Sequence, residues 1–184
     1  RAIYNKNRKH ICMRIKEFFW KGINGLFFKE VNCMATVAPL FVSNNILELA
    51  FRENIPVTPM KLQKLLYFLY RYYLKKTNEP LFADRFETWK YGPVLSEVYY
   101  EFARYRDREI KEFYIDRNGK CYKVRGGSNP IFDSVLNEVW NKYKNYSGIQ
   151  LSNITHLPNT AWRKAWQSNK NFLSDEDIYA EKVE

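Results

Sequence analysis

Residues 59–74, PMKLQKLLYFLYRYYL, carry the clearest helical pattern in the chain. Thr58 stands where a helix N-cap is expected, and Pro59 suits the first helical position, where its missing N–H costs no hydrogen bond. Apolar residues then recur at steps of three and four: Leu62, Leu65, Leu66, Leu69, Tyr72 and Tyr73. Basic residues follow the other face, which we expect to be solvated: Lys61, Lys64, Arg71, Lys75 and Lys76. This stretch predicts the strongest helix of the protein.

Helical patterns also lie on both sides of this stretch. Before it, Ser43 can cap a short amphipathic helix that ends near Asn54. After it, WKYGPVLSEVYYEF (residues 89–102) breaks at Gly92, and Pro93 is expected to start the next helix. The apolar side of that helix would hold Val94, Leu95, Val98, Tyr99 and Phe102. Later helices are predicted from LSNITH (151–156) and from N-caps at Ser128 or Asn129, Thr160 and Ser174.

The apolar period changes to two in EIKEFYI (109–115) and KCYKV (120–124). The joining residues include Asn118-Gly119, which favours a type I′ turn because both central positions need positive φ. We therefore expect a two-stranded β-hairpin at about residues 109–125. The predicted fold class is mainly α, a single compact helical domain with this small hairpin.

The composition fits a folded domain with an appendage. The chain has 184 residues, of which 46% are hydrophobic and 17% aromatic, and so many rings are typical of a packed core. We place a boundary near residues 33–40, where Pro39 disfavours a continuous helix. The predicted parts are a basic aromatic extension at residues 1–33 and a domain at residues 34–184. Met34 resembles a natural start position, which would make the extension upstream sequence.

The net charge of +10 is concentrated in this extension. Residues 1–33 hold eight Lys or Arg and two acidic side chains, whereas the remaining 151 residues hold 22 basic and 18 acidic ones. Such a mixed surface gives little reason to expect a nucleic-acid groove. Nucleic acid is therefore a weakly supported partner, favoured only by the extension and by Arg104, Arg106 and Arg108.

The cysteines and the apolar runs indicate where in the cell the protein is located. Cys12, Cys33 and Cys121 form no C-x-x-C pair, so neither a disulfide framework nor a zinc knuckle is indicated. The longest apolar runs fall far short of the ~20 residues that span a bilayer, and residues 1–33 show no signal-peptide cleavage site. We expect a cytoplasmic protein without a transmembrane segment.

Side chains for catalysis are scarce. The sequence has two histidines, His10 and His156, and His156 could pair with Ser152, Thr155 or Cys121 as a base with a nucleophile. A histidine between an apolar helical turn and a proline is more often structural, however. The sequence also lacks the glycine-rich phosphate-binding motifs and a nucleophile elbow. We predict a protein that is not an enzyme and has no catalytic residue, metal or cofactor.

Three motifs in this order resemble the signature of the Panacea domain of phage- and plasmid-associated antitoxins, which include SocA-like and GepA-like proteins. They are a K-L-x-K-L-L-Y helix, an aromatic-x-Y-G-P-V-x-x-x-V-Y corner and an L-S-x-x-T-H turn before a tryptophan, and the resemblance covers roughly residues 43–182. The signature residues are Leu62, Lys64, Leu65, Leu66, Tyr67, Trp89, Tyr91, Gly92, Pro93, Val94, Val98, Tyr99, Thr155, His156 and Trp162. One departure is Ala161, which stands where the family has a proline before the tryptophan.

The resemblance implies that the signature is mostly structural, with Val98 and Tyr99 packing against the helix that carries Leu62. We also expect a partly buried polar cluster of Tyr67, Tyr91 and His156, the alternative being three separate surface groups. The implied function is that of an antitoxin, which binds and neutralises the toxin encoded by an adjacent gene. The alternatives are an adaptor that delivers the toxin to a protease and a DNA-binding regulator of its own operon.

The extension has a pattern of its own. HICMRIKEFFWKGINGLFFKEV (residues 10–31) predicts an amphipathic basic helix, weakened by Gly22 and Gly25. Such a helix can dock in a partner's groove or lie on an anionic membrane. The candidate partner-binding residues are Phe18, Phe19, Trp20, Phe27 and Phe28, since aromatic anchors dominate many interfaces.

Overall fold

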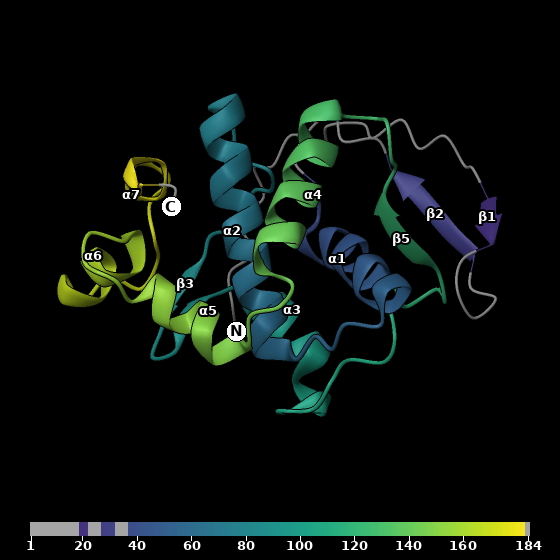
Figure 1. Ribbon diagram of the computed structural model, residues 1–184, viewed down its shortest axis with the longest axis horizontal. Coiled ribbons are helices and arrows are strands. Elements are labelled where there is room, and N and C mark those ends of the chain that lie inside the picture. The colour runs from purple at the N-terminus through teal and green to yellow at the C-terminus, as the bar shows by residue number, and fades with distance from the viewer. Residues whose placement is uncertain (1–18, 22–26, 32–36, 183–184) are drawn as a thin grey trace, which may run out of the picture.

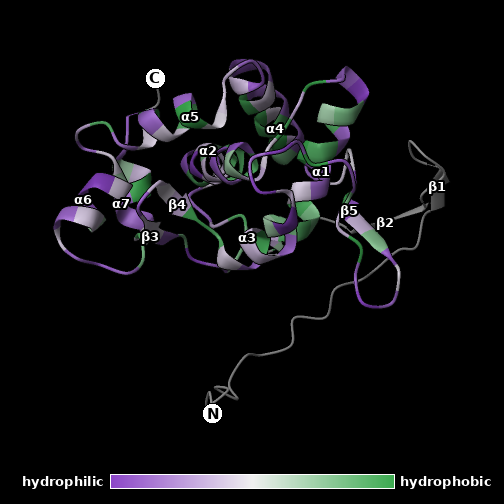
Figure 2. Cartoon of the chain, turned by 90° about the horizontal axis from the view of Figure 1, so that it is seen from below, coloured by the Kyte–Doolittle hydropathy of each residue, from purple (hydrophilic) through white to green (hydrophobic). Residues whose placement is uncertain are grey.

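The computed structural model describes residues 37–182 in full and the backbone of residues 19–21 and 27–31. Helix α2 (Pro59–Thr77) occupies the centre of the described part, and α1 (Pro39–Glu53), α4 (Pro130–Tyr143) and α5 (Gly148–Thr155) pack on it (Figure 1). At right angles to that view, α2 lies between α4 and α5 on one side and α3 (Ser96–Phe102) and β4 (Gly92–Val94) on the other (Figure 2). The mainly α class is confirmed.

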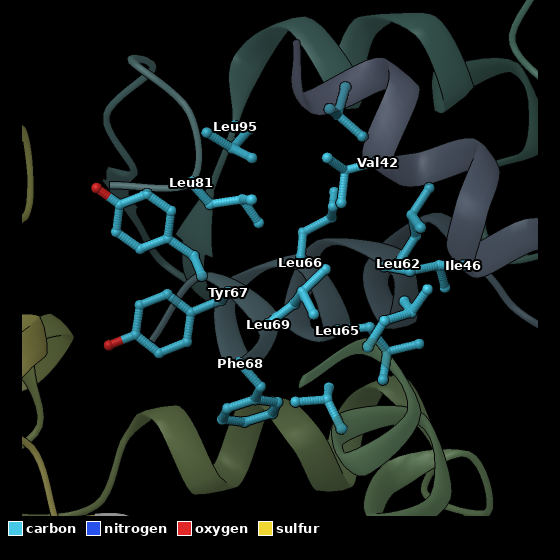
Figure 3. Close-up of a cluster of buried hydrophobic side chains, with 14 of the residues drawn as sticks. Val42, Ile46, Leu62, Leu65, Leu66, Tyr67, Phe68, Leu69, Leu81 and Leu95 are labelled. Carbon is cyan, nitrogen blue, oxygen red and sulfur yellow. The ribbon is translucent and has the colours of Figure 1, made fainter. Parts of the chain in front are cut away.

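Helix α2 has the predicted start. The side chain of Thr58 accepts a hydrogen bond from the Lys61 backbone N–H, and Asn78 ends the helix in the left-handed region at φ 59°. Figure 3 shows that Leu62, Leu66 and Leu69 lie among side chains of α1 and its neighbours, including Val42 and Ile46. The predicted apolar stripe is therefore the centre of the hydrophobic core.

The predicted solvated face of α2 is wrong. Lys61, Lys64 and Arg71 are 5%, 1% and 4% exposed, because α5, β4 and α7 (Asp175–Ala180) cover this side of the helix. Only the end of α2 carries basic side chains toward solvent, at Lys75 and Lys76. A central helix that is covered on all sides must bury its charges and satisfy them internally.

Helix α1 starts five residues earlier than predicted, with Ala38 instead of Ser43 at the N-cap position. Pro39 occupies the first turn, and the Ser43 hydroxyl donates to the Pro39 carbonyl from within the helix instead of capping it. Proline tolerates this position because the first turn leaves its N–H groups unbonded in any case. The predicted end is confirmed, since Asn54 has φ 53° and caps the helix.

The two-stranded antiparallel sheet is present but not at residues 109–125. It consists of β3 (Glu87–Trp89) and β4, with Trp89 paired to Gly92 across the turn. Pro93 therefore lies in a strand, and helix α3 begins at Ser96 and continues as a 3₁₀ turn, η2 (Ala103–Tyr105).

Asn44 explains why the predicted hairpin does not form. Its amide donates to the carbonyls of Tyr114 and Tyr122, and its side-chain oxygen accepts from the Tyr114 N–H. The buried amide thus takes the place that a second strand would hold. Asp116–Lys120 still forms a tight turn, with Gly119 at φ 72°.

The second half of that region forms β5 (Cys121–Val124), which pairs in parallel with β2 (Phe27–Val31). The register places Phe28 opposite Cys121 and Val31 opposite Val124, and β1 (Phe19–Lys21) adds to β2 antiparallel. The predicted helix is therefore wrong at residues 19–21 and 27–31, which are strands. Gly22 and Gly25 lie outside the described residues. Phe18 and the side chains of Phe19, Trp20, Phe27 and Phe28 lie outside the described parts. The boundary at residues 33–40 stays a prediction.

Three helices of the C-terminal third, α4, α5 and α7, pack on α2. Helices α4, α5, α6 (Ala161–Gln167) and α7 begin at Asn129, Ser147, Thr160 and Ser174, each of which caps with its side chain, as predicted for Asn129, Thr160 and Ser174. Residues 171–173 then run beside β3, where the Thr88 N–H donates to the Asn171 carbonyl and the Leu173 N–H to the Phe86 carbonyl.

Candidate functional site

Several signature residues meet at residues 89–95, which we call the corner. Five of its backbone carbonyls face side-chain donors from other elements. The donors are Trp162 for Trp89, His156 for Lys90, Ser152 for Tyr91, Lys64 for Pro93 and Gln63 for Leu95. Because a chain reversal leaves carbonyls without sheet partners, these side chains satisfy groups that would otherwise be costly to bury.

Helices α5 and α6 supply one side of these contacts. The indole Nε1 of Trp162 donates to the Trp89 carbonyl at 2.8 Å, and the Ser152 hydroxyl donates to the Tyr91 carbonyl at 2.9 Å. The His156 ring lies against Trp162, with 3.7 Å between the ring centroids. The L-S-x-x-T-H turn and the following tryptophan are therefore the clasp that holds the corner.

The two ring nitrogens of His156 both face carbonyl oxygens. Nδ1 lies 2.6 Å from the Ser152 carbonyl and Nε2 lies 3.2 Å from the Lys90 carbonyl. The neighbouring Thr155 hydroxyl donates to the same Ser152 carbonyl at 2.7 Å. The Thr155 hydroxyl also lies 3.3 Å from Nδ1 of His156, but Nδ1 and the hydroxyl each make a shorter contact with the Ser152 carbonyl, at 2.6 Å and 2.7 Å. These contacts show both side chains holding the backbone of the turn, which is a structural role.

Cys121, the other nucleophile considered for His156, lies in β5. Its thiol accepts from the Asn44 amide at 3.4 Å, and burial raises the pKa of the thiol to about 12. A thiol with such a pKa carries little thiolate near neutrality, so it behaves as a packed side chain.

Lys64 supplies the contact from α2. Its Nζ donates to the Pro93 carbonyl at 2.9 Å in a position where the side chain is 1% exposed. Burial lowers the pKa of this lysine from 10.5 to about 7. The lysine is thus a structural donor, whose uncharged form the surroundings favour. Next to it, the Gln63 amide both donates to the Leu95 carbonyl and accepts from the Leu95 N–H.

Gly92 is required by this arrangement for two reasons. Its φ of +103° is a conformation that side chains disfavour. A Cβ at this position would lie 2.7 Å from the Thr155 hydroxyl and 2.9 Å from Nζ of Lys64. The glycine therefore lets the corner approach α2 and α5 closely enough for the five contacts to form.

The predicted cluster of Tyr67, Tyr91 and His156 is wrong. Tyr67 is fully buried and donates its hydroxyl to the carboxylate of Glu181, whereas the Tyr91 side chain is 59% exposed. Ser152 links the backbone of Tyr91 to His156. Its hydroxyl donates to the Tyr91 carbonyl, and its carbonyl lies 2.6 Å from Nδ1 of His156. The true partner of Tyr67 lies over 100 residues away in the sequence, which no local pattern reveals.

Glu181 is the centre of a buried charge network. It accepts from Arg71 at 2.6 Å, from the Ala161 N–H at 2.6 Å and from the Tyr67 hydroxyl, and it is 2% exposed. Burial, and then Glu181, raise the pKa of Tyr67 well above its usual value. The network joins the end of α7 to α2 and to the N-terminus of α6, a second role of α2 that no local sequence pattern indicates.

The remaining signature residues divide between core and surface. Leu62, Leu65 and Leu66 of α2 are buried, and so are Val94 and Val98. Tyr99 is 38% exposed and lies beside Trp89, 4.8 Å between ring centroids, so its predicted packing against the Leu62 side of α2 is wrong. The exposed faces of Tyr91, Tyr99 and Tyr100 leave aromatic surface beside the corner.

Two further findings concern the described residues as a group. Within them, no set of three or more His, Cys, Asp or Glu side chains is placed to hold a metal ion. In the same part of the chain, none of the helices combines the length and the apolar character needed to span a bilayer.

Comparison with known proteins agrees with this geometry. Residues 62–163 match the model of the family described as antitoxin SocA-like, Panacea domain, a range that includes the α2 motif, the corner and the α5 clasp. Antitoxin SocA of Caulobacter vibrioides (strain NA1000 / CB15N) is 42% identical over 62 residues. That alignment spans 34% of this chain and 33% of the relative, so the chain spans about a third of the curated relative it matches. No solved structure matches the chain. The chain belongs to the SocA-like family defined by the Panacea domain.

Proposed function

We propose that this protein is an antitoxin that neutralises a cognate protein toxin by direct binding, in the cytoplasm. The observation that carries the proposal is membership of the SocA-like family, with a matched range that covers every signature contact of the corner. The toxin is the product of an adjacent gene.

The use of the signature side chains supports a binding role. Lys64, Trp162 and Nε2 of His156 contact backbone carbonyls of the corner. The corner therefore has a structural role, and the surfaces around it contact the toxin. A protein that acts by binding needs a fixed platform because ordering a surface in advance reduces the entropy lost on association.

Co-expression with the adjacent gene tests this function. The full chain is expected to restore growth to cells that the adjacent gene arrests, and the two proteins are expected to elute together. Gly92→Val is the matched negative control, since its side chain would collide with Thr155 and Lys64. Gly126→Ala is the positive control, because a Cβ there meets open space. Arrest by the adjacent gene that the full chain does not relieve would contradict the proposal.

Two alternative mechanisms give different results in the same cells. An adaptor would lower the amount of toxin only when the protease is present, whereas a neutralising antitoxin leaves the toxin amount unchanged and its activity blocked. A regulator would shift promoter DNA with a steep salt dependence. Arg104, one of the arginines considered for that role, is bound to Glu112 at 2.6 Å and lies over Tyr105.

The extension is a proposed second part of the toxin contact. Deletion of residues 1–33 is expected to leave the domain folded, because the described core lies within residues 37–182. If Phe18, Phe19, Trp20, Phe27 and Phe28 anchor the toxin, this shortened chain binds it more weakly in calorimetry. An unchanged affinity would remove the extension from the contact.

A further inference from the structure

A basic cleft of about 570 Å³ opens beside the Glu181 network. It lies between the C-terminal end of α4, the turn that joins α5 to α6, and the end of α7. Its lining includes four cationic side chains and one carboxylate: Arg71, Lys142, Lys164, Lys182 and Glu181. The family signature takes no part in this lining.

The charges of the cleft do not cancel. Glu181 is saturated by Arg71, Tyr67 and the Ala161 N–H, and Lys164 is paired with Asp177 at 3.0 Å. Among the described residues, neither Lys142 nor Lys182 forms an ion pair with a carboxylate. Lys142 instead donates to the Tyr72 hydroxyl at 3.0 Å, a neutral acceptor. Two positive charges are therefore left over, in a concave surface where the low dielectric of the walls strengthens their field.

A buried donor of Arg71, one of the residues that line the cleft, lacks a hydrogen-bond acceptor among the residues that the structure describes. Arg71 is 4% exposed, and its Nε has no hydrogen-bond partner within the described part of the chain. Since this atom is buried, it is not a contact point for a ligand, but the guanidinium charge below the surface adds to the positive potential of the cleft.

Apolar side chains form the rim. Tyr146 and Leu157 both line the cleft and are each 40% exposed, and Pro158 stands beside them. The turn that carries Leu157 is fixed by Thr160, whose hydroxyl donates to the carbonyls of Thr155 and Leu157. A fixed aromatic and aliphatic rim around a charged floor is suited to a peptide with both acidic and apolar side chains.

We propose that this cleft binds an acidic segment of the partner toxin, with carboxylates toward Lys142 and Lys182 and an apolar side chain against Tyr146 and Leu157. The inference rests on the proposed antitoxin function and adds the surface and the chemistry of the segment that it recognises. Charge complementarity favours this occupant, because acidic groups supply the counter-charge for Lys142 and Lys182. Binding of this kind weakens as salt rises.

The test compares two full-length variants with the same change in net charge. Lys142→Glu with Lys182→Glu reverses the cleft, and Arg108→Glu with Lys170→Glu reverses two exposed side chains that do not line it. Affinity for the purified product of the adjacent gene is measured by calorimetry at low and high salt. We expect the cleft variant to lose about tenfold or more in affinity and most of the salt dependence, and the control to stay within about twofold.

Lys182→Glu alone guards against a folding defect, because this side chain is exposed and follows the last helix. It is expected to lose about threefold or more in affinity with an unchanged thermal midpoint. Equal affinities of wild type and cleft variants, or equal losses in cleft variant and control, would overturn the proposal that the cleft binds the toxin. The antitoxin function would stay in place. A wild-type chain that neither binds nor rescues overturns both.

Discussion

The ammonium nitrogen of Lys64 lies 2.9 Å from the carbonyl oxygen of Pro93, at a site where the lysine side chain is 1% exposed. A lysine at such a depth is unusual, because transfer of the charge from water is costly. The contact joins α2, the central helix, to the corner, and it fills the space that Gly92 leaves open. It therefore explains why the family signature contains both a lysine in the helix and a glycine in the turn.

The first prediction concerns the stability of the fold between about pH 7 and pH 10. Burial lowers the pKa of Lys64 from 10.5 to about 7. Between these values the unfolded chain keeps the proton and the folded chain releases it, so the folded state gains stability as the pH rises. Below pH 7 both states are protonated, and the cost of burying the charge is present in full.

Lys64→Met removes this proton linkage. We expect the free energy of unfolding of the wild type, relative to the variant, to rise by about 1–3 kcal/mol between about pH 7 and about pH 9. Denaturant titrations of both proteins at several pH values measure the difference, and other titrating groups cancel because the two chains share them. Parallel pH curves would contradict a lysine with a lowered pKa.

The second prediction concerns Gly92. Gly92→Ala places a Cβ 2.7 Å from the Thr155 hydroxyl at a φ of +103°. We expect a loss of about 2–4 kcal/mol in the free energy of unfolding, since backbone strain and overpacking add. Gly126→Ala is the control, with no contact within 4 Å, and should stay within about 0.5 kcal/mol. A Gly92→Ala protein that melts with the wild type would show that the corner can move away from α2 and α5 at little cost.

The third prediction concerns the buried pair of Arg71 and Glu181. Glu181→Gln leaves the guanidinium buried without its counter-charge, and we expect a loss of about 3–5 kcal/mol in stability. Adding Arg71→Met to Glu181→Gln should recover a large part of that loss, because the uncompensated charge is then gone. Thermal melts of the two variants measure this. Additive losses in the double variant would contradict the charge network as the cause.

The fourth prediction concerns Asn44. Asn44→Leu removes the amide that donates to Tyr114 and Tyr122 and accepts from Tyr114. Because three backbone groups then lose their partner, we expect about 2–4 kcal/mol of destabilisation, with faster hydrogen exchange at Tyr114. Asn153→Ala, at an exposed position of α5, is the control and should change stability by about 0.5 kcal/mol or less. A mild Asn44→Leu phenotype would show that residues 114 and 122 can pair without it.

Whether a feature of the fold can be predicted from the sequence depends on how far apart along the chain its interacting residues lie. Caps such as Thr58 and Asn129 act within three residues, so the starts of α2 and α4 were predictable. The failed hairpin depends on Asn44, about 70 residues away, and the burial of Arg71 depends on Glu181. Local periodicity carries no information on such pairs. Similarly, the sequence shows the apolar stripe of α2, but it does not show that α5, β4 and α7 cover the basic side of the same helix.

The candidate site was predictable as a set of residues and not as an arrangement. Motif order brought together Lys64, Gly92 and His156, which the structure does place around one corner. What the motif could not supply was the role of each side chain as a donor to a corner carbonyl. Gln63 was missed altogether, since a glutamine inside a helical stripe gives no signal until its partner, Leu95, is known.

The most direct test of the antitoxin function is the growth of cells that express the adjacent gene, alone and with this full chain. We expect arrest by the adjacent gene, recovery with the wild type and with Gly126→Ala, no recovery with Gly92→Val, and a complex of the two proteins that survives gel filtration. Persistent arrest in the presence of folded wild-type protein, with no complex, would contradict this function.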